Sequence, residues 1–292
     1  MKQAKDMPSK LNGILRLHFC VWTDAETAWM TRALLEPSLK KFNPIKLHAG
    51  KTVFLGLDLS RNKDLTAKGV VVKTGEVKKG KNKGKPKYDA WVEIWTPGDT
   101  MATRELADEL PYTQWAREGY ISAPKGKSIS YRHVAQSVAE DANNYDVGLL
   151  AYDAYAFESS FVPEVEELGL DIPFAAHPQG GVKKGRATEE MKSAAKLAGR
   201  EPQGLWMPGS IRQLEDLLLE GRIRILTNPA LISAIMSAVT DEDRWGNYWL
   251  AKERSTNKID PAIALAMAVG AAAAMENAGT VSTDDWIEGL KE

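Results

Sequence analysis

The stretch Thr52-Val-Phe-Leu-Gly-Leu-Asp-Leu-Ser60 is the starting point for interpreting the rest of the chain. Both alternating sets of its side chains are mostly apolar, which is typical of a central strand buried on both faces. Asp58 stands at the end of this strand, and a carboxylate among apolar neighbours is costly to bury unless it is neutralised, paired or bound to a cation. The alternative is a solvated Asp at the point where the strand leaves the sheet. The stretch predicts a buried strand that ends in a candidate functional acid.

The composition limits the chemistry that this acid can join. The chain has 292 residues, is 43% hydrophobic and carries a formal charge of −1, which suits one large domain, or a domain with an appendage. The one cysteine, Cys20, excludes an internal disulfide and a Cys-based zinc cluster, and the four histidines are well separated. A bound metal would therefore have oxygen ligands, which favours Mg²⁺ or Mn²⁺. No signal peptide is evident, and the alanine-rich run 259–275 is too short and too weakly hydrophobic to span a bilayer, so we expect a soluble protein.

A lysine-rich segment follows the first strand. Residues 68–73 are expected to pair with it as a hairpin, and residues 88–95 form a third strand. Between them, residues 73–87 hold seven lysines and three glycines, so they cannot bury themselves and predict a mobile loop or a hairpin tip. Such a segment suits contact with a phosphate backbone, although it also fits a solvated linker. The candidate DNA-binding residues here are Lys78, Lys79, Lys81, Lys83, Lys85 and Lys87.

A second informative stretch is residues 146–153, a buried strand that ends in Asp153. It follows a clear amphipathic helix at residues 130–142, capped by Ser130, and is therefore expected to run parallel to the first strand. Sites in open α/β sheets form at the carboxyl ends of parallel strands. We therefore expect Asp58 and Asp153 at the same edge of the sheet, and Asp146 far from it.

The third stretch is Lys258-Ile-Asp-Pro-Ala-Ile-Ala-Leu-Ala-Met-Ala268. Pro261 fits the first position of a helix, so Asp260 can be explained simply as its N-cap. The neighbouring Lys258, and a helix of Ala and Ile that can pack flat on a sheet, equally suit an acid delivered from a helix start. Both interpretations stay open.

Weaker signals lie between the second and third stretches. The loop 179–186 is glycine-rich and carries Lys183, Lys184 and Arg186, which could clamp phosphates, but it lacks the spacing of a nucleotide-binding loop. Around it we expect helices at 159–168, 187–198 and 210–220, strands at 172–175 and 222–226, and a helix opened by Asn228-Pro229.

Three carboxylates brought together without cations would repel one another and raise their pKa values. Two divalent cations about 4 Å apart remove that conflict, and such a pair can activate a water, hold a scissile phosphate and stabilise the leaving 3′-oxygen. The chemistry needs neither histidine nor cysteine. It predicts an α/β domain with a carboxylate–metal centre for phosphodiester hydrolysis.

The order of these pieces resembles the ribonuclease H-like nuclease fold: an α/β fold whose mixed sheet, an antiparallel hairpin plus parallel strands, has helices on both faces. More narrowly, the chain resembles the nuclease domain of the tailed-bacteriophage terminase large subunit. The resemblance covers about residues 50–275, and its matching pieces are residues 54–60, 115–120, 145–153, 228–229 and 258–264, with the helix after Ser130. Residues 11–35, with Val21-Trp-Thr23 and Trp29, resemble the segment that joins the ATPase domain to the nuclease. The expected organisation is a linker or appendage at 1–50, a nuclease domain at 51–278 and a tail at 279–292.

The resemblance implies a divalent-metal-dependent endonuclease that cuts double-stranded DNA during genome packaging, using two Mg²⁺ or Mn²⁺ ions. Asp58, Asp153 and Asp260 match the metal-binding catalytic acids of the family, and Lys258 is expected to help hold a phosphate. The implied partners are double-stranded DNA, the small terminase subunit and the portal, without a membrane, in the cytoplasm of an infected or lysogenic bacterial host. The sequence holds no Gly-x-x-x-x-Gly-Lys-Ser/Thr phosphate loop, so the ATPase domain is expected to be missing or on a separate chain.

Two other functions remain open from the sequence. One is a resolvase or transposase-type nuclease on the same fold, which would prefer branched to linear DNA. The other is a non-catalytic DNA-binding assembly module, in which the three acids are only strand-end and capping residues.

Overall fold

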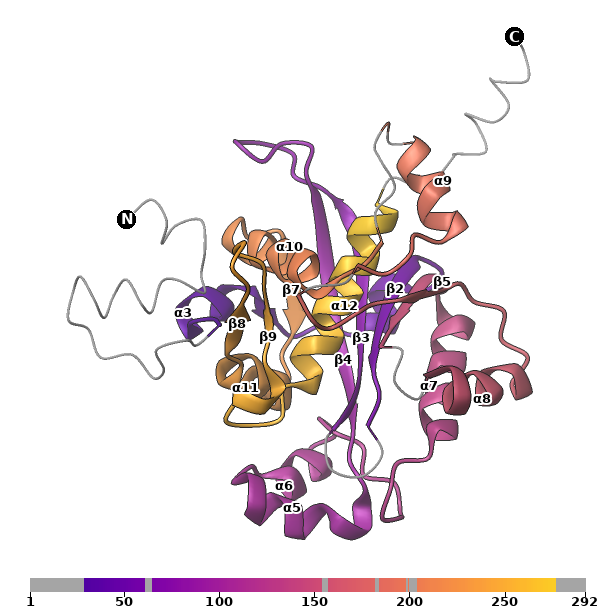
Figure 1. Ribbon diagram of the computed structural model, residues 1–292, viewed down its shortest axis with the longest axis vertical. Helices are drawn as coiled ribbons and strands as arrows, with labels where there is room; N and C mark the ends of the chain where they lie inside the picture. The colour runs from indigo at the N-terminus through magenta and orange to yellow at the C-terminus, as the bar shows by residue number, and fades with distance from the viewer. Residues whose placement is uncertain are drawn as a thin grey trace, which may run out of the picture.

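The strands of the main sheet lie side by side in the order β1-β7-β4-β3-β2-β5-β6 (Figure 1). The computed structural model describes residues 29–60, 65–153, 157–181, 184–197, 199 and 204–276; the predictions for residues 1–28, for Lys183 and for the tail at 279–292 lie outside these ranges. The strands are β1 (Leu39–Lys40), β7 (Ile223–Leu226), β4 (Pro86–Trp95), β3 (Thr66–Glu76), β2 (Thr52–Asp58), β5 (Asp146–Tyr152) and β6 (Phe174–Ala176).

The directions of the strands confirm the predicted mixed sheet. β3 is antiparallel to both β2 and β4, whereas the pairs β2–β5, β5–β6, β4–β7 and β1–β7 are parallel. This combination of a central antiparallel hairpin with flanking parallel strands is that of a ribonuclease H-like fold. Thr52 pairs with Asp146, and its hydroxyl donates to the Asp146 carboxylate at 2.8 Å, so Asp146 lies at the far end of β5 from Asp153, as predicted.

Helices cover both faces of the sheet, and each face has its own apolar core. On one face lies the buried helix α12 (Asp260–Met275), with α9 (Glu189–Leu197), α10 (Met207–Leu219) and α11 (Pro229–Ser237) around it (Figure 1). The other face carries α4 (Pro44–His48), α7 (Tyr131–Asn144), the π-helical turn Phe157–Phe161 and α8 (Val162–Glu167). Smaller elements are α3 (Arg32–Leu35), α5 (Met101–Asp108), α6 (Tyr112–Arg117), the β8 (Thr240–Glu242) and β9 (Tyr248–Leu250) hairpin, and 3₁₀ turns at Glu36–Ser38, Gly98–Thr100 and Lys252–Arg254.

Two glycines allow α12 to lie directly on the sheet. Gly56 of β2 and Gly69 of β3 are cross-strand partners, and a Cβ atom on either would come within 2.5 Å of the Ala264 carbonyl oxygen. No side chain larger than hydrogen fits there. The prediction that a helix of Ala and Ile packs flat on the sheet is confirmed, and the contact fixes the position of α12 along β2.

A buried ion cluster attaches α7 to the opposite face. Lys68 of β3 has no exposed surface; its ammonium forms ion pairs with Asp141 and, at 3.3 Å, with Glu93, and donates to the Ser137 hydroxyl at 2.5 Å. A buried ammonium needs such partners because its desolvation is otherwise uncompensated. Burial raises the pKa of Asp141 to about 6, although Lys68 opposes the shift.

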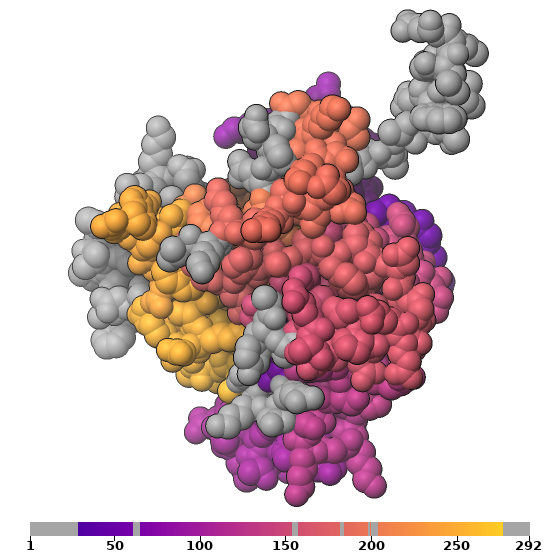
Figure 2. Space-filling model, turned by 45° about the vertical axis from the view of Figure 1, so that its right-hand side comes forward, coloured from indigo at the N-terminus to yellow at the C-terminus, as the bar shows by residue number. Residues whose placement is uncertain are grey.

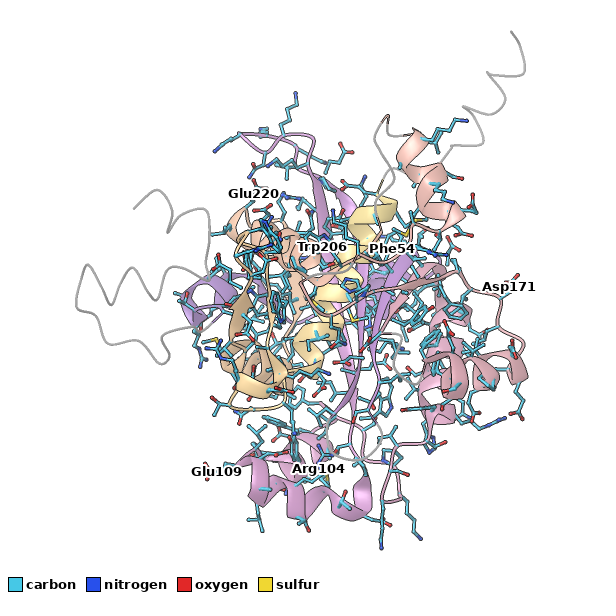
Figure 3. All side chains as sticks on the ribbon, viewed as in Figure 1. Phe54, Arg104, Glu109, Asp171, Trp206 and Glu220 are labelled. Atoms are coloured by element: carbon cyan, nitrogen blue, oxygen red, sulfur yellow. The ribbon has the colours of Figure 1, made fainter. Side chains whose placement is uncertain are left out.

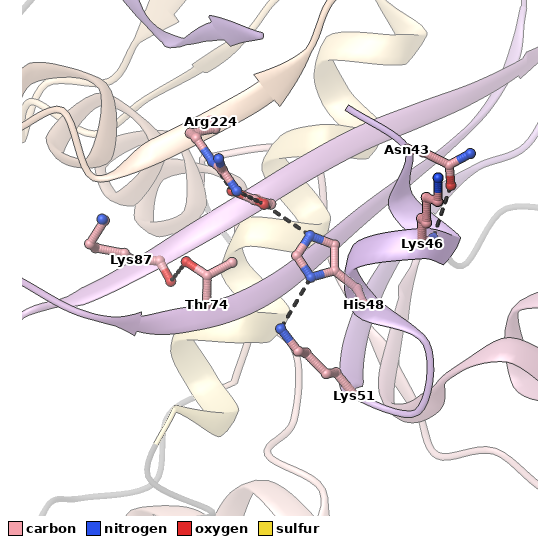
Figure 4. A network of polar contacts seen from close by, with 8 residues as sticks. Asn43, Lys46, His48, Lys51, Thr74, Lys87 and Arg224 are labelled. Carbon is pink, nitrogen blue, oxygen red and sulfur yellow. Dashed lines mark hydrogen bonds and ion pairs between the residues drawn. The ribbon is translucent and has the colours of Figure 1, made fainter. Parts of the chain in front are cut away.

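A second polar network joins α4 to β4 and β7 (Figure 4). The fully buried Asp89 receives the Arg224 Nε hydrogen bond at 2.6 Å and lies 2.9 Å from His48 Nε2, while Lys51 Nζ lies 3.4 Å from His48 Nδ1. Burial lowers the pKa of His48, against the opposing influence of Asp89. The network secures residues that precede β2 in the chain to the middle of the sheet.

Trp29 is a packing residue. Its side chain is completely buried, and its Nε1 donates to Glu215 of α10 at 2.8 Å. The same carboxylate accepts from the Tyr248 hydroxyl of β9 at 2.5 Å. Residues 29–48 share the core of the main sheet and add β1 to it; the domain boundary at residue 50 stays a prediction.

Candidate active site

Asp58 and Asp260 share one cation at the carboxyl end of β2. The Lys252 ammonium lies 2.8 Å from Asp58 Oδ2 and 3.0 Å from Asp260 Oδ1. Only 2% of Asp58 and 1% of Asp260 are exposed, so both carboxylates are held inside the protein around a positive charge. Two acids that are far apart in the sequence therefore meet at one point.

Chain geometry explains why these two acids meet. Side chains alternate across a strand, so Gly56 and Asp58 face the same side of β2; residues four apart share a face of a helix, so Ala264 and Asp260 do too. Because Gly56 and Ala264 are in close contact, the nearest residues on the same faces of the strand and the helix, Asp58 and Asp260, lie side by side.

The capping interpretation of Asp260 is wrong. The helix N-cap is Ile259, whose carbonyl accepts from the amides of Ala262 and Ile263 at 2.9 and 3.1 Å, and Asp260 is the first helical residue. Pro261 fits the first turn in either register, which is why the sequence could not place the boundary. The Asp260 carboxylate is instead an ion-pair partner of Lys252.

Asp153 lies next to this pair. β2 and β5 are parallel with Leu57 opposite Tyr152, and carrying the register one residue further sets Asp153 beside Asp58 on neighbouring strands, which are about 4.8 Å apart. Its charge is felt at Asp58, whose pKa it raises. Unlike the other two acids, Asp153 is only partly buried.

The environment of Asp58 favours its neutral form unless a cation is near. Burial raises the pKa of Asp58, Lys252 and the Gln179 amide lower it, and Asp153 raises it further. Gln179 Nε2 donates to Asp58 Oδ1 at 3.2 Å. The balance makes this edge of the sheet a place where added positive charge is stabilised.

The three-acid metal centre stays a prediction. Within the described ranges, no three His, Cys, Asp or Glu side chains are grouped so that they could hold a metal ion together. Asp58 and Asp260 instead form ion pairs with the Lys252 ammonium. The three candidate acids nevertheless come from the three elements that the sequence indicated.

The predicted DNA-binding residues fall into separate regions. Lys258 lines a cavity of about 120 Å³ together with Lys252, Asp260 and Asp108, so it lies beside the acids. Lys184 stacks over Trp206, with its ammonium 4.7 Å from the ring centre, and Arg186 is exposed. The lysine-rich segment is remote from the site, because β3 and β4 carry it to the opposite end of the sheet (Figure 1). Nucleic-acid contact by all of these residues stays a prediction.

Lys252 and Gln179 were missed by the sequence analysis. Gln179 belongs to the glycine-rich loop that was considered only for its cations. Lys252 follows β9 in a short 3₁₀ turn, and neither that turn nor the β8–β9 hairpin has a periodic pattern that the sequence analysis recognised. The one available signal was a cation a few residues before the Lys258–Asp260 stretch.

The fold and the paired acids define a ribonuclease H-like protein with a carboxylate site at the sheet edge. The chain belongs to the family described as the terminase large subunit, endonuclease domain, whose family model matches residues 1–198 and 203–276.

The chain is also similar to individual proteins and to a solved structure. The chain is 28% identical over 271 residues to the terminase large subunit of Enterobacteria phage HK97, an alignment that covers 93% of this chain and 46% of that protein. It is 24% identical over 289 residues to protein YmfN of Escherichia coli strain K12, with 96% and 56% covered. The crystal structure of the HK97 bacteriophage large terminase superposes with a TM-score of 0.66 and 26% identity, covering 92% of this chain and 49% of that one. The chain thus spans about half the length of these relatives. No helix in its described part is long and apolar enough to cross a membrane.

Proposed function

We propose that this chain is a divalent-metal-dependent endonuclease that cleaves double-stranded DNA during phage genome packaging, by two-metal phosphodiester hydrolysis. The ATPase activity that drives packaging would come from another domain or chain, and the small terminase subunit and portal are its expected partners in the host cytoplasm. The observation that carries the proposal is the pair of buried carboxylates, Asp58 and Asp260, held around one cation at the edge of a ribonuclease H-like sheet.

The acids at this edge offer the type of donor atom that a hard divalent cation prefers. Their donors are carboxylate oxygens, which suit Mg²⁺ and Mn²⁺, and the burial of Asp58 makes its ionised form depend on nearby positive charge. Asp58, Asp153 and Asp260 would hold two such ions, with Asp58 between the other two acids. When bound, the ions activate a water and stabilise the leaving 3′-oxygen.

The remaining groups position the acids and the phosphate. Lys252 neutralises Asp58 and Asp260, which keeps two buried carboxylates from repelling each other before DNA arrives. Gln179 holds Asp58 Oδ1 and fixes the carboxylate plane. Lys258, on the wall of the cavity beside Asp260, supplies a positive charge for a DNA phosphate.

Plasmid nicking in Mn²⁺ tests this function, with Asp58→Asn and Asp153→Asn as the variants. Each keeps the shape of the side chain and removes its charge, and we expect each to lower the nicking rate at least about 100-fold, the scale of lost metal or acid–base contributions. Asp146→Asn is the matched control, because Asp146 lies on β5 at the opposite end from Asp153. Thermal denaturation of all three variants checks that they fold.

Other outcomes would assign the chain differently. Full activity of Asp58→Asn would remove Asp58 from catalysis. A strong preference for four-way junctions over linear duplex would favour a resolvase. Absence of calorimetric Mn²⁺ binding, with DNA affinity intact, would favour a non-catalytic DNA-binding module.

A further inference from the structure

The lysine-rich segment forms an ordered ribbon that extends the sheet. β3 and β4 pair as far as Glu76 opposite Pro86, and beyond them Val77 and Lys85 are joined by an amide-to-carbonyl hydrogen bond of 2.9 Å. Gly80 and Gly84, both with φ of +83°, close the turn in a conformation that favours glycine. We call residues 77–85 the lysine hairpin; of the two predicted forms, a hairpin tip is the one found.

The base of the lysine hairpin is fixed to the body of the protein. Lys85 Nζ forms an ion pair with Glu220 Oε1 at 2.5 Å, next to the end of α10. Arg222 bonds both this carboxylate, at 2.6 Å, and the Pro86 carbonyl, at 2.8 Å. Glu220 lies at the foot of the hairpin in Figure 3. The ribbon therefore projects in a set direction from the end of the molecule that is opposite α5 and α6 (Figures 1 and 2).

The lysine hairpin carries several positive charges close together on the protein surface. Lys78, Lys79, Lys81 and Lys83 are exposed, and none of them forms an ion pair with a residue that the structure describes. The residues between them are Gly80 and Asn82, so lysine ammonium groups make up most of the polar surface of the hairpin. Flexible ammonium groups suit the phosphates of a nucleic-acid backbone.

The register of the sheet gives the distance from the hairpin to the acids. Asp58 pairs with Ala67 of β3, and the strand then runs to Glu76, which corresponds to roughly 30 Å at about 3.3 Å per residue. The hairpin tip lies somewhat further. A B-form duplex presents the same side again after one helical turn, about 34–36 Å or 10 base pairs. Lys78, at the base of the hairpin, is 11 residues beyond Ala67, which is about 36 Å at the same rise, and this distance matches one helical turn.

We infer that the lysine hairpin binds the backbone of the same duplex that enters the acid site, about one helical turn from the phosphate held there. The inference rests on the proposed function for the identity of the first contact. A duplex bound at both points lies along the direction of β3. The position of the cut is then fixed relative to a second contact, at the lysine hairpin, that does not depend on the DNA sequence. Any DNA shorter than about one turn would reach only one of the two contacts at a time.

Equilibrium binding in EDTA tests this inference without requiring cleavage. Fluorescence anisotropy would compare labelled duplexes of about 8 and about 24 base pairs over a series of salt concentrations. Each phosphate contact adds about 0.9 to the slope of log K against log salt. We expect the wild-type slope to be steeper by about 2 to 4 on the long duplex, because that duplex alone reaches both contacts. In the double variant Lys81→Gln/Lys83→Gln, this difference in slope between the long and short duplexes should shrink by up to about 2. In the quadruple variant, which adds Lys78→Gln and Lys79→Gln, the difference should nearly disappear.

The control is Lys41→Gln/Lys46→Gln, which removes two exposed charges elsewhere on the surface and should keep the full increase. Equal wild-type slopes on the two duplexes, or an unchanged increase in the quadruple variant, would overturn the inference. If the nuclease proposal were wrong but this inference right, Mn²⁺-dependent nicking would be absent while the difference in salt slope between the two duplexes remained.

Discussion

The carbonyl oxygen of Ala264 lies 2.3 Å from the position that a Cβ atom would take on Gly56. This contact between β2 and α12 is too close to admit any side chain at Gly56. Gly56 is two residues before Asp58 on the strand, and Ala264 is one helical turn after Asp260. The glycine thus controls the spacing of two acids without touching either.

Gly56→Ala is expected to destabilise the fold by about 1–3 kcal/mol, because the added methyl meets backbone that cannot rotate away. It should also lower the nicking rate by more than the loss of folded protein explains, since a displacement of about 1 Å can cost about 100-fold. Urea denaturation and plasmid nicking measure the two effects. Gly180→Ala is the control for stability: its added Cβ meets no atom within 4 Å, so the unfolding free energy should stay within about 0.5 kcal/mol of wild type or rise slightly. Equal stabilities of Gly56→Ala and wild type would contradict the argument.

Lys252→Met should destabilise the protein more at pH 8 than at pH 4. Removing the ammonium takes away a group that lowers the pKa of Asp58, so this pKa rises further above its ordinary value of 3.8. An acid with a raised folded-state pKa loses stability as pH rises from its unfolded value toward the folded one. Lys252 is 36% exposed, so water replaces part of its effect, and we expect a loss of about 1–3 kcal/mol at pH 8.

Thermal melts of Lys252→Met and of Lys46→Met, an exposed-site control, measure this difference. Mn²⁺ should then raise the melting temperature of Lys252→Met more than that of wild type, because the ion no longer competes with the ammonium for Asp58 and Asp260. A pH-independent loss of stability, together with no extra effect of Mn²⁺, would show that Lys252 acts only by packing.

Glu215→Gln should remove a pH dependence of stability between about pH 4.5 and pH 7. Burial raises the pKa of Glu215 from 4.5 to about 7, although Tyr248 and Trp29 donate hydrogen bonds to it. Over this window the folded state binds more protons than the unfolded state, so wild-type stability falls as pH rises, by up to about 3 kcal/mol. Glutamine resembles the protonated acid, so the unfolding free energy of the variant should lack this contribution and fall less than that of wild type between pH 5 and pH 7.5. Parallel urea curves for both proteins at pH 5 and pH 7.5 would disprove the effect.

Much of the fold could be predicted because its central elements have unambiguous patterns. The doubly apolar runs that end in Asp58 and Asp153 each became a buried strand, and the alanine-rich run after Asp260 became a buried helix. Asn228 caps α11 through its side chain, as the Asn-Pro pair indicates. These are features in which local preference and burial agree.

The parts that could not be predicted depend on contacts between distant residues. The helix boundary at Asp260 moved by one position because proline fits either register. Lys252 has the appearance of any surface cation in the sequence, and only the packing of α12 on β2 brings it between two acids. The separation of the lysine hairpin from the site follows from the length of β3, and its last residues, Thr74 to Glu76, have no apolar alternation that marks them as strand.

The position of α12 has a consequence for synthesis of the protein. Translation releases Asp58 and Asp153 long before Asp260, which opens the last helix that the structure describes. Until that helix is made, Gly56 and Gly69 lack the helix that packs on them, and the third acid does not exist. Under the proposed function, a polypeptide that ends before Asp260 would lack one of the three acids, so DNA cleavage would begin only after the ribosome has made α12.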